Sequence, residues 1–122
     1  MKKTAVIVSG YFNPLHKGHI EYFKFARTKG ELLFVIVNND NQRKLKGSRL
    51  FMLEDERVLI IRELKLVDRV FLSIDQDKSV SESIKMIYNE FGTMYNLVFA
   101  NGGDQNSSYI PESDICNSLK IK

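Results

Sequence analysis

Four short apolar runs without polar alternation constrain the fold of this chain more than any other feature. They occupy residues 5–8, 32–37, 70–72 and 97–100. Such a run is typical of a strand buried on both faces, because a strand with one wet face alternates apolar and polar residues. Between the runs, apolar residues recur at helical spacing. Strands and helices therefore alternate, which predicts an α/β fold with an open parallel sheet of about five strands flanked by helices.

The helices are predicted from side chains that share a face. Three such faces consist of His19, Phe23 and Ala26, of Arg57, Ile60, Ile61 and Leu64, and of Val80, Ile84, Ile87 and Phe91. Gly30 stands where the first helix should have its C-terminal cap. Ser79-x-x-Glu82 predicts a capping box for the third helix, which should stop at Gly92. Pro111 favours the first turn of a further short helix.

The size and composition predict one soluble domain spanning residues 1–122. The chain is 43% hydrophobic and 27% charged, so it can bury a core and does not have a disordered composition. Its net charge of +3 favours anionic ligands but is too small to indicate nucleic acid. The single cysteine, Cys116, indicates a reducing compartment, and the longest apolar run is far too short for a membrane span. We therefore expect a cytoplasmic protein that binds neither nucleic acid nor membranes.

The segments that follow the strands are the predicted ligand-binding region. In parallel α/β sheets, ligands bind beyond the carboxyl ends of the strands, near the point where the strand order reverses. In this chain those ends lead into residues 9–17, 38–50, 73–79 and 101–111. The unusual residues of the chain fall in these segments.

Both histidines, His16 and His19, lie at the start of the first predicted helix. Residues at this spacing share a helix face, so both imidazoles should point inward, beside backbone N–H groups that favour an anion. Gly18 should leave room for a phosphate, and Gly10 permits the tight turn out of the strand. In one alternative, one histidine caps the helix while the other packs. In another, the pair belongs to a zinc site, although a third ligand at suitable spacing is lacking.

A longer motif surrounds these histidines: Gly10-Tyr11-Phe12-Asn13-Pro14-Leu15-His16-Lys17-Gly18-His19. It resembles the signature of the HxGH nucleotidyltransferase superfamily, the cytidylyltransferase-like group, and the resemblance extends to about Ile115. It implies a Rossmann-like sheet and transfer of a nucleotidyl group from an NTP to a phosphorylated small molecule, with release of pyrophosphate. It further implies Mg²⁺ brought with the NTP, no metal ligand from the protein, no covalent intermediate and a homodimer.

The resemblance also implies roles for residues of the motif. His16 and His19 would contact the triphosphate and stabilise the developing negative charge as catalytic residues. Gly10, Tyr11, Phe12 and Gly18 would line the nucleotide. This agrees with elementary chemistry, since phosphoryl transfer needs positioning and charge neutralisation more than bond-making groups.

Four cations lie close together in the second segment, namely Arg43, Lys44, Lys46 and Arg49. A solvated charge run is the default interpretation, but its place beside the histidine segment favours phosphate binding. The stretch is similar to the lysine-bearing loop of glycerol-3-phosphate cytidylyltransferases and to the Lys-Gly turn of heptose-phosphate adenylyltransferases. We expect Lys46 to be catalytic and Lys44 to bind the acceptor or a phosphate.

Arg57 is a further candidate for the acceptor or a phosphate. It lies on the second predicted helix, in the pair Glu56-Arg57. Members of the resembled family often have an arginine in a Glu-Arg pair here that reaches the active site. The alternative is a guanidinium that extends along the apolar face of its own helix.

The fourth segment contains two adjacent glycines after a buried strand. Asn101, Gly102, Gly103 and Asp104 are expected to bind the nucleotide, since glycines at a strand exit permit close approach of the backbone to a base or ribose. An ordinary glycine-rich turn is the alternative. The segment resembles the Gly-Gly-Asp stretch of heptose-phosphate adenylyltransferases, and residues 110–112 continue the likeness.

The expected function is nucleotidyl transfer, of CMP first and AMP next, to an acceptor such as glycerol 3-phosphate or a sugar phosphate. Members of the resembled family run on through another strand and a Ser/Thr-rich turn that binds the triphosphate, and we expect both to be missing after Lys122. Either the chain is shortened or part of its site is lost. The alternative function is therefore a catalytically weakened nucleotide-binding or assembly subunit of the same fold.

Overall fold

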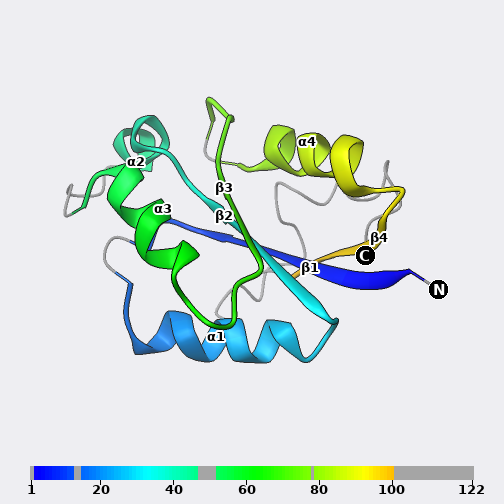
Figure 1. Ribbon diagram of the computed structural model, residues 1–122. Coiled ribbons are helices and arrows are strands. Elements are labelled where there is room, and N and C mark those ends of the chain that lie inside the picture. Colours follow the sequence, from blue (N-terminus) through cyan, green and yellow to red (C-terminus); the bar gives the residue numbers. More distant parts are fainter. Residues whose placement is uncertain (1, 13–14, 47–51, 78, 101–122) are drawn as a thin grey trace, which may run out of the picture.

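A single parallel sheet organises the computed structural model, which describes residues 2–12, 15–46, 52–77 and 79–100 (Figure 1). Its strands are β1 (Lys3–Gly10), β2 (Leu32–Val37), β3 (Arg69–Leu72) and β4 (Tyr95–Phe99), in the order β3-β2-β1-β4. All three neighbouring pairs are parallel. The predicted α/β class is thus confirmed, and each of the four apolar runs lies in or overlaps a strand. The described part of the chain contains four strands where about five were expected.

Helices cover both faces of this sheet (Figure 1). They are α1 (Lys17–Arg27), α2 (Asp40–Lys46), α3 (Glu54–Arg62) and α4 (Ser81–Phe91). On one face, Phe23 and Ala26 of α1 and Ile61 of α3 pack against β1 and β2. On the other face, residues of α4 pack against β1, β2 and β4. Alternate residues of β1 enter opposite clusters, which explains why the apolar runs show no polar alternation.

Helix starts and stops differ from the sequence prediction in two places. The C-cap of α1 is Thr28, not Gly30. Gly30 is needed instead for close packing, because a Cβ there would lie 2.7 Å from the carbonyl oxygen of Thr4 in β1. The predicted Ser79–Glu82 capping box of α4 is also wrong. Its N-cap is Val80, which makes no side-chain capping bond, while Gly92 is the C-cap as predicted.

The carboxylate of Asp75 caps the N-terminus of α4 in place of the predicted capping box. It accepts hydrogen bonds from the backbone N–H of Glu82 at 2.7 Å and of Ser83 at 2.9 Å. A cap supplied from seven and eight residues before the N–H groups that it accepts has no short-range sequence signal, so the local Ser-x-x-Glu pattern was misleading. Asp75 is 3% exposed, which makes this cap part of the protein interior.

Segment 38–50, expected as a loop, contains the helix α2 over Asp40–Lys46. Asn39 and Gln42 begin it with reciprocal hydrogen bonds, from the Gln42 backbone N–H to Asn39 Oδ1 and from the Asn39 backbone N–H to Gln42 Oε1. This arrangement is a capping box with Asn in place of Ser or Thr. None of the described helices is long and apolar enough to cross a membrane.

Candidate active site

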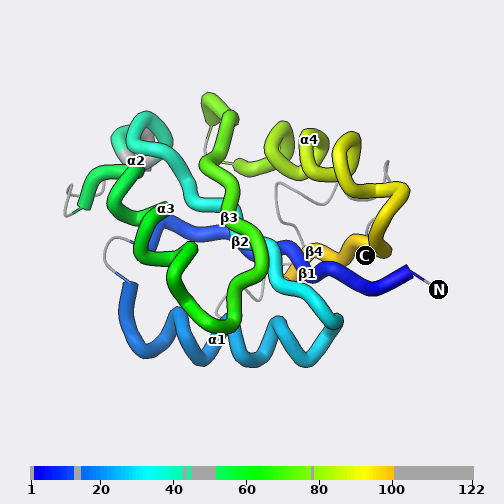
Figure 2. Tube along the Cα trace, viewed as in Figure 1, coloured from blue at the N-terminus to red at the C-terminus, as the bar shows by residue number. Residues whose placement is uncertain are grey.

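The strand order reverses at β1, which has β2 on one side and β4 on the other. The carboxyl end of β1 is therefore the place where a sheet of this kind binds its ligand. Figure 2 shows that the start of α1 and the whole of α2 lie on that same side of the sheet. The tertiary structure thus brings the histidine segment and the cation-bearing helix to one edge, as the sequence predicts.

The two histidines form a stacked pair at the start of α1. His16 is the N-cap, and its Nδ1 accepts a hydrogen bond from the backbone N–H of Gly18 at 3.0 Å. Nδ1 of His19 accepts one from the backbone N–H of His16 at 3.1 Å. The ring centroids are 4.0 Å apart, with 27° between the planes. Since Nδ1 is an acceptor in both rings, the proton of each neutral imidazole lies on Nε2, which stays a hydrogen-bond donor.

Electrostatics keep His19 neutral. Burial, and then the neighbouring His16, lower the pKa of His19 from 6.5 to about 4. At neutral pH the ring therefore donates through Nε2 without carrying a charge. The expectation of one capping and one packing histidine also applies here, because His16 caps α1 and His19 lies edge-on to Phe12 at 4.9 Å. Capping and chemistry are compatible, because they use different nitrogen atoms of the same ring.

Phe12 packs its ring against the ring of His19 from the core of the protein. Its side chain is only 2% exposed and it lies 5.4 Å from the ring of Phe23. Its φ of 52° is unusual for a residue with a side chain, and the packing of its ring in the core holds the backbone there. The structure therefore places the Phe12 side chain in the core, and its expected contact with a nucleotide stays a prediction.

The two glycines of the motif make room for neighbouring rings. A Cβ on Gly10 would lie 2.8 Å from the ring of Phe12, and one on Gly18 would lie 2.9 Å from Cε1 of His16. Both distances are shorter than van der Waals contact, so a larger residue at either position would displace the ring. The sequence predicts that Gly18 leaves room for a phosphate. In the structure, the His16 ring lies where a side chain on Gly18 would begin.

Arg57 is the centre of a buried hydrogen-bond network. Its side chain is 0% exposed. Nη1 donates to the carbonyl oxygens of Tyr11 and Asn38 at 2.7 Å each, and Nε donates to that of Met52 at 3.0 Å. Nη2 pairs with the Asp40 carboxylate at 2.6 Å. Arg57 thus joins the ends of β1 and β2 to the start of α3, and its guanidinium does not extend along the apolar face of its own helix. Its expected role as a phosphate ligand stays a prediction.

Tyr11 is held between this network and α2. It is half-buried, and its hydroxyl donates to the carbonyl oxygen of Gln42 at 3.4 Å. Burial raises the pKa of the Tyr11 hydroxyl, although the nearby Arg57 opposes the rise. Tyr11 therefore stays protonated and is a hydrogen-bond donor at the base of the site.

The two lysines expected to bind phosphate, Lys44 and Lys46, lie on α2. Lys44 is exposed, and Lys46 is the last residue of the helix, with its side chain outside the described residues. Four of the predicted nucleotide-binding residues, Asn101, Gly102, Gly103 and Asp104, also lie outside the described residues, as does the helix expected at Pro111. Their assignments stay predictions.

Comparison with known proteins decides the family. Residues 7–119 match the family described as cytidylyltransferase-like. The chain belongs to this family of nucleotidyltransferases. It is 28% identical to a lipopolysaccharide core biosynthesis protein from Thermoplasma volcanium GSS1, whose crystal structure superposes with a TM-score of 0.76 over 98% of this chain and 91% of that one. The Rossmann-like fold is thereby confirmed.

Sequence relatives include proteins with two different names. The chain is 33% identical over 121 residues to the bifunctional protein HldE of Aliarcobacter butzleri strain RM4018, covering 98% of this chain and 24% of that protein. It is 38% identical over 72 residues to the FAD synthase of Thermoplasma volcanium, covering 59% of this chain and 51% of that protein. The chain thus spans about a quarter of the HldE proteins that it matches.

Sequence reasoning missed three polar residues that hold the segments after the strands, namely the half-buried Asn39 and the buried Gln42 beside the site, and the buried Asp75 at the start of α4. Gln42 is 0% exposed and Asp75 is 3% exposed. The spacing Asn39-x-x-Gln42 directly after an apolar run was an available signal, since it has the form of a capping box. The contacts of these residues with the segment after β3 had no such signal.

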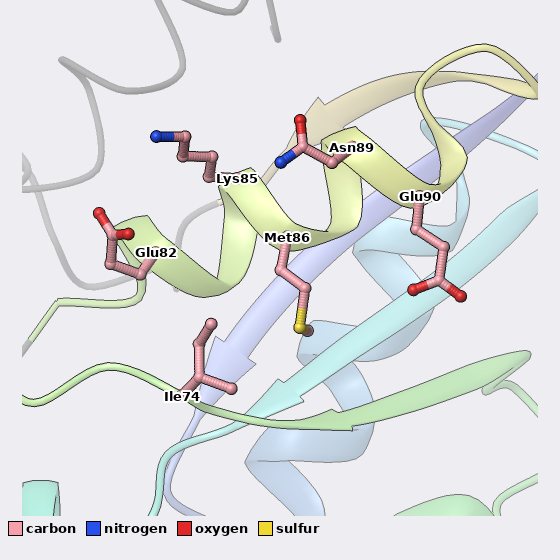
Figure 3. Close-up of a pocket in the computed structure, with 6 residues that line it drawn as sticks. All are labelled: Ile74, Glu82, Lys85, Met86, Asn89 and Glu90. Carbon is pink, nitrogen blue, oxygen red and sulfur yellow. The ribbon is translucent and has the colours of Figure 1, made fainter.

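A shallow pocket of about 490 Å³ lies apart from the histidines, over the outer side of α4. Figure 3 shows Met86 and Ile74 pointing into the space between α4 and the end of β3. Glu82 and Lys85 extend from the start of α4 instead, so acidic and basic groups are mixed there. A mixed rim of this kind does not select a phosphate chain, which leaves the edge at β1 as the candidate active site.

No metal cluster marks the site within the part of the chain that the structure describes. There, no three His, Cys, Asp or Glu residues are close enough to hold an ion together. Two carboxylates next to the site already have partners. That of Asp40 pairs with Arg57 and accepts from the Glu54 backbone N–H, and that of Glu54 accepts from the Asp40 backbone N–H. Among the described residues, these two carboxylates do not form a protein-held Mg²⁺ site.

Proposed function

We propose that the chain transfers a nucleotidyl group from an NTP to a phosphorylated small molecule and releases pyrophosphate. The observation that carries the proposal is the stacked pair of His16 and His19 at the start of α1, each with Nδ1 engaged and Nε2 available as a donor. The pair stands at the carboxyl end of β1, where the strand order reverses.

In this reaction, a phosphate oxygen of the acceptor attacks the α-phosphorus of the NTP. The new P–O bond forms as the bond to the bridging oxygen of pyrophosphate breaks, and the electron pair leaves with pyrophosphate. Negative charge develops on the transferred group and on the leaving oxygen, so donors fixed in advance stabilise the transition state. The imidazoles of His16 and His19 supply such donors, and the backbone amides hold both rings in place.

Helix α2 supplies the cations. Lys44 is exposed on α2, beside the edge where the histidines lie, and Lys46 ends that helix. An ammonium group binds a phosphate as a compact charge with several donors. We assign Lys46 to the phosphates of the NTP and Lys44 to the phosphate of the acceptor.

The relatives favour an adenylyl group over the cytidylyl group that the sequence placed first. FAD contains an adenylyl group joined to a flavin phosphate, and a relative carries the name FAD synthase. The structural neighbour is titled as a protein of lipopolysaccharide core biosynthesis, and that core is built of sugars. We therefore propose ATP as the donor and a sugar phosphate as the acceptor, with Mg²⁺ bound to the phosphates of ATP. A homodimer and a cytoplasmic location are further proposals.

Pyrophosphate release tests this function directly. The chain is incubated with Mg²⁺ and each of ATP, CTP, GTP and UTP, with a sugar 1-phosphate, glycerol 3-phosphate or FMN as the acceptor. Release that requires both an NTP and an acceptor, and that falls at least 100-fold in His16→Asn, is the expected result. NTP binding without release for any acceptor would contradict the proposal and favour a nucleotide-binding subunit of the same fold.

A further inference from the structure

The side-chain amides of Asn39 and Gln42, here called the amide clasp, join α2 to the segment that follows β3. Asn39 Nδ2 donates to the carbonyl oxygens of Ser73 and Asp75 at 3.0 Å each. Gln42 Nε2 donates to those of Asp77 and Ser79 at 2.7 Å each. The two amides thus use all four of their N–H groups on alternate carbonyls of a single segment.

The clasp lies largely in the interior of the protein, where Gln42 is buried and Asn39 is half-buried. Gln42 is 0% exposed although it is the third residue of a seven-residue helix. The amide oxygen of each clasp residue also accepts the backbone N–H of the other, in the capping box that begins α2. Each buried polar atom of the pair therefore has a partner, as a buried amide requires.

A second anchor holds the opposite side of the same turn. Asp40 and Glu54 exchange hydrogen bonds, each carboxylate accepting the backbone N–H of the other residue, at 2.8 and 3.2 Å. Arg57 pairs with the same Asp40 carboxylate. The first turn of α2 is thus fixed to α3 on one side and to the segment after β3 on the other.

Helix α2 needs such anchors because it is short. A helix of seven residues is not stable in water by itself, so its place and even its existence depend on tertiary contacts. Its second half bears Arg43, Lys44 and Lys46. The anchored first turn therefore determines where these cations stand relative to the histidines.

We infer that Asn39 and Gln42 are positioning residues, which set the cations of α2 for phosphate binding without touching substrate. The inference rests on the proposed function, since it takes the α2 cations to be phosphate ligands. It predicts that removal of the clasp weakens the binding of a phosphate chain and raises KM, while kcat changes little, because uniform binding energy is lost.

The test uses inorganic tripolyphosphate as the probe, since it has the phosphate chain of an NTP and no base. Its affinity is measured by isothermal titration for the wild type, Gln42→Met and Gln42→Asn. The Asn variant keeps an uncharged amide that is one CH₂ shorter and does not reach both carbonyls, so it is the milder change and a second chance to retain the fold. We expect about a tenfold loss of affinity in both variants, and a similar rise in the KM for the NTP.

A matched control separates positioning from stability. Ile87→Val reduces the core on the α4 side of the sheet, and Ile87 takes no part in the clasp. It should lower the melting temperature while leaving tripolyphosphate affinity within about twofold of the wild type. If the Gln42 variants lose only stability, as this control does, the inference is overturned.

A second background distinguishes failure of the inference from failure of the proposed function. In Lys44→Ala/Lys46→Ala, tripolyphosphate should bind at least tenfold more weakly, and a further Gln42→Met change should have little additional effect, because the clasp acts through those cations. An additive effect of Gln42→Met would overturn the inference alone. Full affinity in Lys44→Ala/Lys46→Ala would overturn the assignment of the cations in the proposed function, and the inference with it.

Discussion

Two polar regions lie at the same edge of the sheet and use their side chains in opposite ways. At the start of α1, His16 is exposed and His19 is half-buried. Around α2, Arg57 and Gln42 are both 0% exposed. Each region is held by hydrogen bonds between side chains and the backbone. The two regions differ in whether a side-chain donor is left over once those hydrogen bonds are made.

Each histidine uses one ring nitrogen for structure and keeps the other. In Arg57, by contrast, all three guanidinium nitrogens donate to groups of the protein. In Gln42 both the amide nitrogen and the amide oxygen are engaged. A side chain with every polar atom satisfied in the interior shapes the site, whereas one with a donor in reserve can act on a substrate.

The largest expected effect is on the buried side of this comparison. Arg57→Met should lower the free energy of unfolding by about 3–5 kcal/mol, because it removes the guanidinium donors of the Asp40 carboxylate and of three backbone carbonyls. Urea denaturation measures it. A loss below about 1 kcal/mol together with a large drop in rate would make Arg57 a phosphate ligand, as the sequence suggested.

On the histidine side, the effect should fall on rate instead of stability. His16→Asn retains a good N-cap for α1 but has no counterpart of Nε2. We expect kcat to fall about 100–1,000-fold, equivalent to about 3–4 kcal/mol of barrier, since one donor to the transition state is lost.

Urea denaturation of the same variant checks the other half of this claim. The free energy of unfolding should stay within about 0.5 kcal/mol of the wild type. His16→Ala, which also removes the cap, should lose about 1 kcal/mol more. If His16→Asn keeps most of its rate, the histidine serves only to cap α1 and the two regions are alike.

Asp75 tests whether a buried cap away from the reacting groups matters only for stability. Asp75→Ala removes the acceptor of two N–H groups at the start of α4 and should cost about 1–2 kcal/mol in the free energy of unfolding. Its kcat should stay within about twofold of the wild type, since the side chain faces α4 and not the histidines. A selective loss of kcat in a stable variant would place Asp75 among the functional residues.

A change at Gly18 should lower kcat and leave stability unchanged, which is the opposite of the result expected for Asp75→Ala. Alanine favours helix over glycine by about 1 kcal/mol, which offsets a similar loss from disturbing the His16 cap, so Gly18→Ala should be about as stable as the wild type. The new Cβ would displace the ring of His16, which a glycine accommodates at present, and kcat should fall about tenfold. Thermal unfolding and kcat together measure this, with Ala26→Gly as a control that weakens α1 away from the pair.

The smallest effect concerns pH. The folded pKa of His19, about 4, lies below its ordinary value of 6.5, so the unfolded chain binds more protons between these values. The stability that His19 contributes is therefore present above pH 6.5 and is lost as the pH falls toward 4. His19→Asn should flatten that part of the stability profile. An unchanged profile would mean that His19 titrates normally and donates as a cation below pH 6.5.

The sequence by itself determined where the four described strands and three of the four described helices lie, the exception being α2. Continuous apolar runs require burial on both faces, and that requirement holds for any chain that folds into a sheet with helices above and below. The sequence also predicted which edge of the sheet carries the histidine pair, because a helix that follows a strand begins at the carboxyl end of that strand.

Only the tertiary structure showed which polar residues have every polar atom engaged in the interior. Arg57 and Tyr11 are 46 positions apart, and Gln42 and Ser79 are 37 apart. A short pattern reports that a position is buried, but it carries no information about a hydrogen-bond partner so distant in the chain. Arg57 was therefore expected to bind phosphate, and the amide clasp was not expected at all. Burial without water makes each of those partners obligatory, so the fold and not the motif assigned their roles.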